Sequence, residues 1–272
     1  IYVGASYFNQ LNIPIGLVLL FLMGIGPLLS WNYTSKSVLL NRFKLPLSVS
    51  FLSGIGYMIF SSSFQIYVFV AIMGVSFTLS SILGEFYKSY KKQKKGSNFL
   101  HSIVKMFLSN RHKNGGYIVH IGIVLLFIGF IGRAFEVEKE FSLSPGEQIY
   151  FSNYVFKLNS IKSEARDNHY AFLSEIDVVD SSTNQLLVNL KPEKRIYFYW
   201  NSDPEKRQPH SELDIYSTIQ KDIYSIFSGY DAQKNIGYFK IMINPLVNWV
   251  WIGGVLMVIG SLFAFWPSRR DN

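Results

Sequence analysis

Five stretches of the chain consist almost entirely of apolar residues and could cross a membrane as helices. A transmembrane helix needs roughly 20 such residues to span a hydrocarbon core about 30 Å thick. The five stretches are residues 12–31, 45–61, 63–86, 115–134 and 245–266. The second is short and rich in Ser and Gly, and the first contains a Gly-Ile-Gly-Pro interruption near its end. This pattern predicts a polytopic α-helical membrane protein with about five spans in this chain.

Residues 135–243, between the last two apolar stretches, change to an alternation of apolar and polar residues. The runs YVFKLNS (154–160) and AFLSEIDVVD (171–180) each place apolar side chains on one face of a strand. Further strands are expected at 185–190, 194–200, 222–228 and 236–243, with turns at 144–147, 151–153 and 181–184. About seven short strands joined by polar turns predict an antiparallel β domain inserted between the last two spans.

The charged residues orient these spans. Positive charge gathers in residues 32–44, in residues 88–113 and in the tail at Arg269–Arg270, and the first two segments contain no acidic residue. Alternating spans bring all three to one side, which the positive-inside rule makes cytoplasmic. The β domain, with 16 acidic and 12 basic residues, is then extracytoplasmic. The net charge of +8 therefore reflects topology, and no nucleic-acid partner is expected, because such proteins cluster basic residues on a folded domain.

Composition supports a membrane protein and excludes thiol chemistry. Charged residues make up 16% of the chain, compared with about 25% in soluble domains. Cysteine is absent, so the chain has no disulfide, thiolate metal site or thiol nucleophile of its own. It begins at Ile1, without a signal-peptide pattern and close to a span, so we expect a fragment or one piece of a split protein.

These patterns divide the chain into four parts. Residues 1–114 hold three spans and a basic cytoplasmic loop, in which residues 98–109 place their apolar side chains on one helical face. That segment is either a helix lying in the membrane interface or a simple connector. Residues 115–134 form the fourth span, residues 135–243 the β domain, and residues 244–272 the last span with a basic cytoplasmic tail.

The fourth span contains one ionisable residue, His120, about 8 Å along the helix from Gly115. Such a residue is costly in hydrocarbon unless it has a partner, which makes it a functional candidate. Gly116, Val124 and Phe127 share its face, where the glycine leaves room for a flat, bulky group. Gly122 and Gly129 lie opposite, where they allow a neighbouring helix to approach closely. A neutral imidazole suits an axial haem ligand, a hydrogen bond to another helix, or a proton pathway.

The β domain shows no recognisable chemistry. His169 and His210 are isolated, with no ligand-like spacing, and we expect both to be ordinary surface residues. The charged cluster at Lys191–Arg195 fits a solvated turn about as well as a binding site, and its role is open.

Six stretches resemble, in the same order, the CcmF family, the membrane haem lyase subunits of system I cytochrome c maturation, to which the NrfE-type proteins are related. They are YFNQLNIPIGLVLLFLMGIGPLLSW (7–31), GGYIVHIGIVLLFIG (115–129), SLSPGEQIYFSNYVFKL (142–158), LKPEKRIYF (190–198), HSELDIYSTIQKDIYSIF (210–227) and NPLVNWVWIGGVLMVIG (244–260). The resemblance covers nearly the whole chain but only the C-terminal part of the family's length.

The resemblance implies that His120 is an axial ligand of a membrane-embedded haem b, with Gly116, Val124 and Phe127 on the haem-facing side. No second histidine lies in a span of this chain, so the other axial ligand would come from outside it. The family's tryptophan-rich segment, where incoming haem meets apocytochrome, also has no counterpart here. The catalytic residues are therefore unknown, and the chain would be one part of the enzyme.

The family's reaction takes place in the periplasm of bacteria, at the inner membrane. Haem arrives from a periplasmic haem chaperone, and its vinyl groups are joined to the thiols of a Cys-x-x-Cys-His apocytochrome c, which other maturation factors keep reduced. Haem b is implied to keep the incoming iron reduced, with quinol as a candidate electron source. The remaining partner would be the N-terminal portion of the same lyase.

Two other functions are open at this point. A proton-coupled transporter or channel subunit would use His120 in a proton path, although no acidic residue lies in the interior of any span. A non-catalytic assembly subunit would recruit partners through the β domain.

Overall fold

The computed structural model describes residues 5–29, 35–93, 99–198 and 209–266. It divides into a helical unit, formed by residues up to 134 and from 249 onwards, and a β unit of residues 135–248. The β unit ends at Asn248 rather than at the expected residue 243. Several sequence-based expectations lie outside the described residues: the end of the first span at 30–31, the loop residues 32–34, Lys94 and Lys95, the strand residues 199–200, and Arg269–Arg270.

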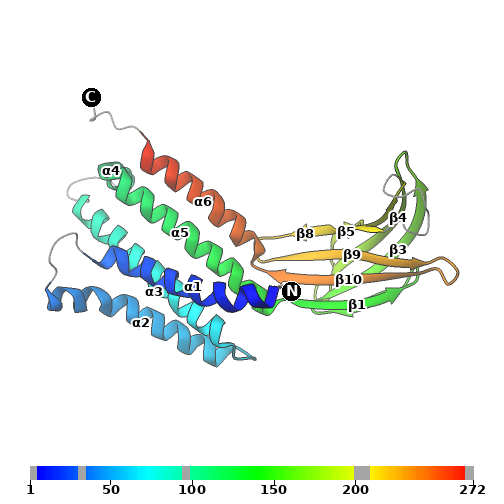
Figure 1. The fold of residues 1–272 in the computed structure, drawn as a ribbon, viewed down its shortest axis with the longest axis horizontal. Helices are drawn as coiled ribbons and strands as arrows, with labels where there is room; N and C mark the ends of the chain where they lie inside the picture. Colours follow the sequence, from blue (N-terminus) through cyan, green and yellow to red (C-terminus); the bar gives the residue numbers. More distant parts are fainter. Residues whose placement is uncertain (1–4, 30–34, 94–98, 199–208, 267–272) are drawn as a thin grey trace. The chain divides into compact units, whose positions relative to one another are not determined.

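The described part of the helical unit contains six α-helices and two short 3₁₀ turns (Figure 1). They are α1 (Ala5–Ile25), η1 (Gly26–Leu28), α2 (Lys36–Phe60), α3 (Ile66–Gln93), α4 (Phe99–Ser109), α5 (Arg111–Gly132), η2 (Arg133–Phe135) and α6 (Val247–Phe265). All the α-helices except α4 are long and apolar enough to cross a membrane, so the five apolar stretches expected as spans are present as five candidate membrane helices.

Three helices extend further into basic sequence than expected. α2 begins at Lys36, α3 continues to Gln93 and α5 begins at Arg111. Lys and Arg can continue a helix at a membrane surface because their long stems carry the charge into water. Much of the basic sequence assigned to loops therefore lies on the ends of helices, where its side chains can face one another.

The Gly-Ile-Gly-Pro interruption predicted in the first span is present and fixes one wall of the site described below. Pro27 has no amide hydrogen and cannot continue the α-helical bonding, and α1 ends at Ile25 before the chain turns as η1. Just before this end, a Cβ on Gly24 would lie 2.6 Å from Oγ1 of Thr78 in α3. That hydroxyl donates a 2.8 Å hydrogen bond to the Leu20 carbonyl, so the end of α1 is held tightly against α3.

Of the two interpretations of residues 98–109, the helical one agrees with the structure, in which residues Phe99–Ser109 form α4. Ser102 and Met106 are buried, whereas Val104 and Leu108 are exposed. Asn114 at the start of α5 donates a 2.7 Å hydrogen bond to the Met106 carbonyl. The face of α4 that carries Ser102 and Met106 therefore packs against the protein, next to this hydrogen bond from α5.

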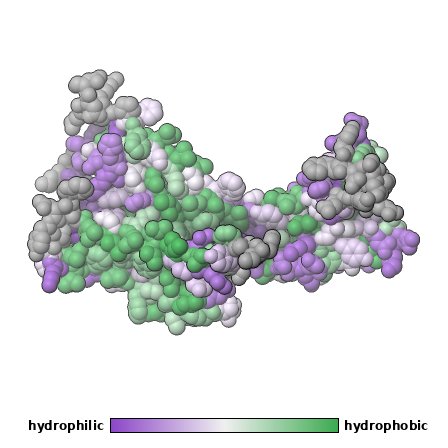
Figure 2. Space-filling model, in the orientation of Figure 1, coloured by the Kyte–Doolittle hydropathy of each residue, from purple (hydrophilic) through white to green (hydrophobic). Residues whose placement is uncertain are grey.

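The helical unit exposes many apolar side chains, as the green surface in Figure 2 shows. Phe60 is 89% exposed, Trp251 72% and Ile59 69%. A soluble protein rarely exposes apolar patches of this extent, whereas lipid or neighbouring membrane helices cover such a surface at no cost. The exposure agrees with the spans predicted from the sequence.

The β unit is a sandwich of two antiparallel sheets. One sheet has the order β1 (Val137–Leu143), β10 (Ile236–Pro245), β9 (Lys221–Asp231), β8 (Asp214–Ser217). The other has the order β2 (Gln148–Phe151), β3 (Tyr154–Ala165), β4 (His169–Asp180), β6 (Glu193–Tyr197), β7 (His210–Glu212), with β5 (Leu186–Leu190) also paired to β4. The six runs expected as strands are confirmed, and β1, β2, β7 and β8 were not expected.

Alternating side chains from both sheets form the core of the sandwich. Phe156 and Ile176 from one sheet meet Phe227 and Phe239 from the other, and all four are almost completely buried. The rings of Phe227 and Phe239 are stacked, with centroids 4.9 Å apart. Polar residues lie on the outer faces, as the period of two requires.

The predicted turns are all present. In the first, the Glu147 amide donates to the Ser144 carbonyl at 3.0 Å, and Gly146 has a φ of +94°. In the third, the Asp180 carboxylate accepts hydrogen bonds from the Ser182 hydroxyl, 2.5 Å, and the Ser182 amide, 2.9 Å. These bonds lower the pKa of Asp180 to about 2, because they stabilise the ionised carboxylate.

Candidate functional site

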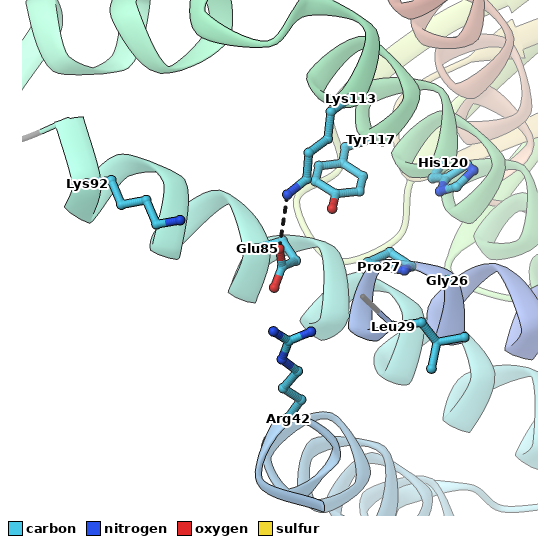
Figure 3. A pocket seen from close by; sticks show the side chains of 9 residues that line it. All are labelled: Gly26, Pro27, Leu29, Arg42, Glu85, Lys92, Lys113, Tyr117 and His120. Carbon is cyan, nitrogen blue, oxygen red and sulfur yellow. Dashed lines mark hydrogen bonds and ion pairs between the residues drawn. The ribbon is translucent and has the colours of Figure 1, made fainter. Parts of the chain in front are cut away.

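His120 lies on α5 and lines a pocket of about 520 Å³ in the helical unit (Figure 3). Three other structural elements and Leu29 contribute to the pocket wall. The lining residues are Gly26 and Pro27 of η1, Leu29 after it, Arg42 of α2, Glu85 and Lys92 of α3, and Lys113, Tyr117 and His120 of α5. The pocket is therefore built where α1 ends and where the basic ends of α3 and α5 meet.

The His120 ring has an unsatisfied nitrogen. Its Nδ1 is buried and has no hydrogen-bond partner among the described residues. Leaving such an atom unpaired costs about 1–3 kcal/mol, so a buried imidazole normally has a partner. Of the alternatives left open by the sequence, a hydrogen bond to a neighbouring helix finds no counterpart in the described part of the chain.

The residues predicted to share the His120 face have different environments. The space that a Gly116 Cβ would occupy has no atom within 4 Å. Val124, in contrast, is fully buried and packs in a cluster with Leu20 and Val75, and Phe127 packs against the same cluster. These two side chains therefore pack against residues of α1 and α3. Only the Gly116 side of the predicted face is open.

The close helix approach predicted on the opposite face is confirmed at Gly122. A Cβ at this position would lie 2.7 Å from the Gly253 carbonyl oxygen and 2.6 Å from Met257 of α6. Gly129, the second predicted glycine, is buried. α5 therefore packs on α6 with one face and presents His120 on another.

Four charged side chains line the pocket: Arg42, Glu85, Lys92 and Lys113. Glu85 accepts a 3.2 Å bond from Lys113 and a 2.9 Å bond from Lys88. Nζ of Lys113 also lies 5.4 Å from the centre of the Tyr117 ring. Arg42 donates to the Leu28 carbonyl at 3.0 Å, near the end of η1. Glu85 is the only acidic residue before residue 136, so positive charge predominates here.

The positions of the pocket residues on α5 could be read from their spacing in the sequence. Lys113, Tyr117 and His120 recur at i, i+4 and i+7, which places them on one helical face. Arg42 and Glu85 come from other helices, and no local pattern brings them to His120. The sequence argument identified the imidazole but missed its charged neighbours.

In the β unit, the expectation that both histidines are surface residues is wrong for His169. It is only 7% exposed, and its Nδ1 lies 2.6 Å from the Asn168 amide oxygen. Its ring contacts Tyr197, with centroids 5.0 Å apart, and Tyr197 also contacts the exposed His210 at 5.8 Å. Pairing of β4 with β6 sets His169 opposite Tyr197, and a one-dimensional pattern does not reveal this register.

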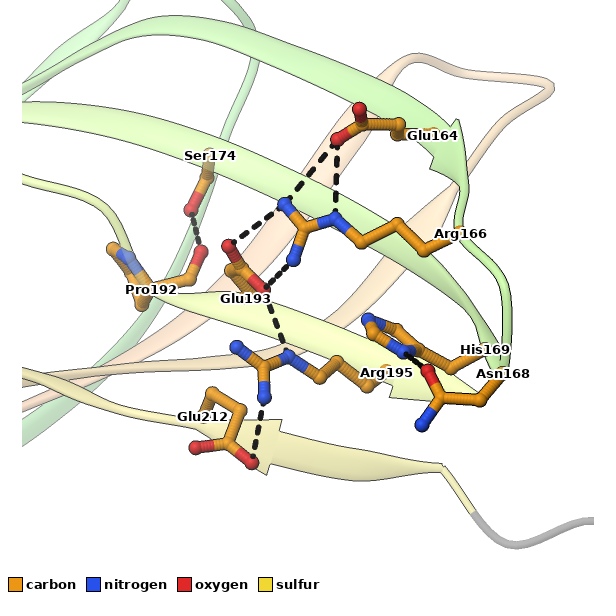
Figure 4. A network of polar contacts seen from close by, with 9 residues as sticks. All are labelled: Glu164, Arg166, Asn168, His169, Ser174, Pro192, Glu193, Arg195 and Glu212. Carbon is orange, nitrogen blue, oxygen red and sulfur yellow. Dashed lines mark hydrogen bonds and ion pairs between the residues drawn. The ribbon is translucent and has the colours of Figure 1, made fainter. Parts of the chain in front are cut away.

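The charged cluster at Lys191–Arg195 is largely a strand rather than a solvated turn, and its Glu193 and Arg195 form ion pairs (Figure 4). Glu193 of β6 accepts from Arg195 at 2.8 Å and from Arg166 at 3.3 Å. Burial raises the pKa of Glu193, but the two guanidinium groups outweigh it and hold the pKa below its ordinary value. Glu164 and Glu212 complete the ladder at its two ends, which explains the cluster as a structural cross-strand network.

Comparison with known proteins covers both units. Residues 134–245 match the family described as the CcmF C-terminal beta-sandwich. A cytochrome c-type biogenesis protein CcmF of Haemophilus influenzae is 24% identical over 270 residues, which is 99% of this chain and 40% of that protein. This chain is similar to the C-terminal portion of CcmF-type proteins. The resemblance inferred from the sequence is confirmed.

Other relatives agree. CcmF of Pseudomonas aeruginosa is 23% identical over 98% of this chain and 38% of its own length. A solved structure of "Cytochrome c Heme Lyase CcmF" superposes with a TM-score of 0.73 at 20% identity, covering 97% of this chain and 41% of that one. The shared fold thus includes the helices as well as the CcmF-type sandwich. The chain spans about two fifths of the length of these CcmF relatives.

Proposed function

We propose that this chain is the haem-b-bearing C-terminal part of a cytochrome c haem lyase. In this role it supports the covalent attachment of haem to the Cys-x-x-Cys-His motif of apocytochrome c. The observation that carries the proposal is His120: its buried Nδ1 has no hydrogen-bond partner among the described residues, and its ring lines the pocket, in a chain similar to CcmF-type proteins over 99% of its length.

The residues around His120 fit a haem. A neutral imidazole is a good iron ligand, and haem proteins commonly use histidine in this position. Gly116 leaves the adjacent helix surface uncovered, and Pro27 and Leu29 offer apolar contacts in the pocket. The second axial ligand would come from polypeptide outside this chain. Haem b bound here would supply a one-electron carrier that can keep incoming haem iron reduced.

The charge distribution supports a location in the bacterial inner membrane, with the β domain in the periplasm. Lys88, Lys91, Lys92, Arg111 and Lys113 lie at the ends of α3 and α5, which supports a cytoplasmic location of these ends under the positive-inside rule. The chain crosses the membrane once more along α5 before the sandwich begins. The β domain is thus on the side where apocytochrome c is matured.

The proposed partners follow from the family. They are the N-terminal portion of the lyase, a periplasmic haem chaperone, apocytochrome c with its thiol-handling maturation factors, and quinol as an electron donor. The tryptophan-rich ligation segment is absent from this sequence, so the thioether-forming step would take place on the rest of the enzyme.

The proposal is tested by absorption spectroscopy of the purified assembly, with this chain and the rest of the lyase present. The wild-type assembly should show a reduced b-type spectrum, and His120→Ala should abolish most of it because an axial ligand is removed. His112→Ala is the matched control, since His112 is an exposed histidine on the same helix. Unchanged haem content in His120→Ala, with the assembly intact, would remove His120 from this role.

A further inference from the structure

The pocket next to His120 collects positive charge from three helices. Arg42 comes from α2, Lys92 from α3 and Lys113 from α5, and all three line the same cavity as Glu85 (Figure 3). Three cations and one carboxylate leave an excess of two positive charges. At the edge of a bilayer, unbalanced charge facing a cavity favours an anionic ligand.

The cations and the imidazole have a fixed spacing along α5. Lys113 and His120 are seven residues apart, which corresponds to about 10 Å along the helix axis, and both line the pocket. The wall between them includes Pro27 and Gly26, and the space beyond the Gly26 Cα has no atom within 4 Å. A ligand that reaches both ends would meet the imidazole at one end, carry negative charge at the other, and find apolar contacts at Pro27 and Leu29.

Haem has this form, because both of its carboxylates, the propionates, lie on one edge of an apolar disc. We propose that the pocket binds the propionates of the haem held by His120, with Lys113 and Arg42 as the principal carboxylate-binding residues. This inference rests on the proposed function. Charge-assisted bonds to carboxylates are the strong class of hydrogen bond, and the guanidinium fork matches a carboxylate in two-point geometry.

Glu85 is the carboxylate that pairs with the pocket lysine Lys113 in this structure. It accepts a bond from Lys113 at 3.2 Å and one from Lys88 at 2.9 Å, so an anionic ligand would compete with it for Lys113. The two excess positive charges of the lining residues then match the two carboxylates, and the pocket becomes neutral once it is filled.

The test uses the intact assembly stripped of haem and titrated with haemin or with haemin dimethyl ester, in which both propionates are esterified. We expect the wild type to bind haemin about tenfold or more tightly than the diester, since one charge-assisted bond alone corresponds to about that factor. Lys113→Gln and Arg42→Gln should each lose most of this preference by weakening haemin binding and leaving diester binding unchanged. Lys113→Arg should retain it.

Lys88→Gln is the matched control. Lys88 also bonds Glu85 but does not line the pocket, so this variant should keep the wild-type preference. The comparison of the two ligands on wild-type protein decides the question even if a variant fails to fold.

The inference is overturned if wild type binds both ligands equally, or if Lys113→Gln and Arg42→Gln keep the full preference, while the His120-dependent spectrum persists. It is also overturned if these variants change only the response to phosphatidylglycerol compared with phosphatidylcholine nanodiscs, which would assign the pocket to a lipid headgroup. If the b-type spectrum did not depend on His120, the proposed function itself would be contradicted.

Discussion

Replacing Gly122 with alanine should separate α5 from α6. The added Cβ would lie 2.7 Å from the Gly253 carbonyl oxygen, whereas ordinary contacts begin at 3.4 Å. The helices must therefore move apart by about 0.7 Å, the difference between these two distances. The neighbouring atom is backbone, so no flexible side chain can rotate away. Overpacking of this kind costs about 1–3 kcal/mol.

Thermal unfolding of the assembly in detergent measures this cost. A domain of 150–250 residues loses roughly 2–4 °C in unfolding midpoint per kcal/mol, so Gly122→Ala should unfold several degrees below wild type. Gly254→Ala is the control, because its Cβ would have no atom within 4 Å. If the two variants were equally stable, α5 and α6 would not pack through this glycine contact, and the orientation of His120 derived from it would be wrong.

Three further predictions concern separate parts of the chain. Gly116→Leu should fill the open space beside His120 and lower haem content without lowering the unfolding midpoint; a lower midpoint with full haem content would contradict the open face. Phe227→Ala should destabilise the sandwich by about 3–5 kcal/mol, because the ring is fully buried; denaturant unfolding measures it, and a loss below about 1 kcal/mol would contradict the packing. The Ser182 hydroxyl and nearby amides lower the pKa of Asp180 to about 2, so its stabilising contribution is complete above the ordinary value of 3.8 and is lost as pH falls through 2; NMR titration of that carboxyl should give a midpoint near 2, and a midpoint near 3.8 would refute the turn geometry.

The spans could be predicted because length and apolarity are local properties, whereas helix ends depend on what surrounds the chain. α2 runs from Lys36 through Arg42 and Lys44, although these residues read as a loop in the sequence. Their charges reach water from a helix as easily as from a loop. Hydropathy therefore located each span but placed several boundaries too far inside it.

Strands were predicted where apolar and polar residues alternate and missed where charge hides the alternation. β1 has the sequence VEKEFSL, and most of its side chains are exposed. It is held by pairing with β10 and by an ion pair between Glu138 and Lys240, 2.8 Å long. Such a strand is specified by its partner, which lies about 100 residues later in the chain. β7 and β8 are too short for any period to be visible.

The candidate site shows the same division between local and long-range information. His120 stands out in the sequence because an imidazole in a span is costly. The contributions of Arg42 and Glu85 depend on how α2 and α3 pack, and the covering of Val124 depends on α1 and α3. The role of a residue within one span could be predicted from the sequence. The charged surroundings that several helices contribute to it could not.

A density map of the intact lyase, with this chain and its N-terminal portion together, tests the central claim most directly. The account predicts porphyrin density with iron at the His120 imidazole, a histidine from the other polypeptide on the far side of the metal, and carboxylate density near Lys113. An imidazole surrounded only by acyl chains, or bonded only to protein groups, would contradict it.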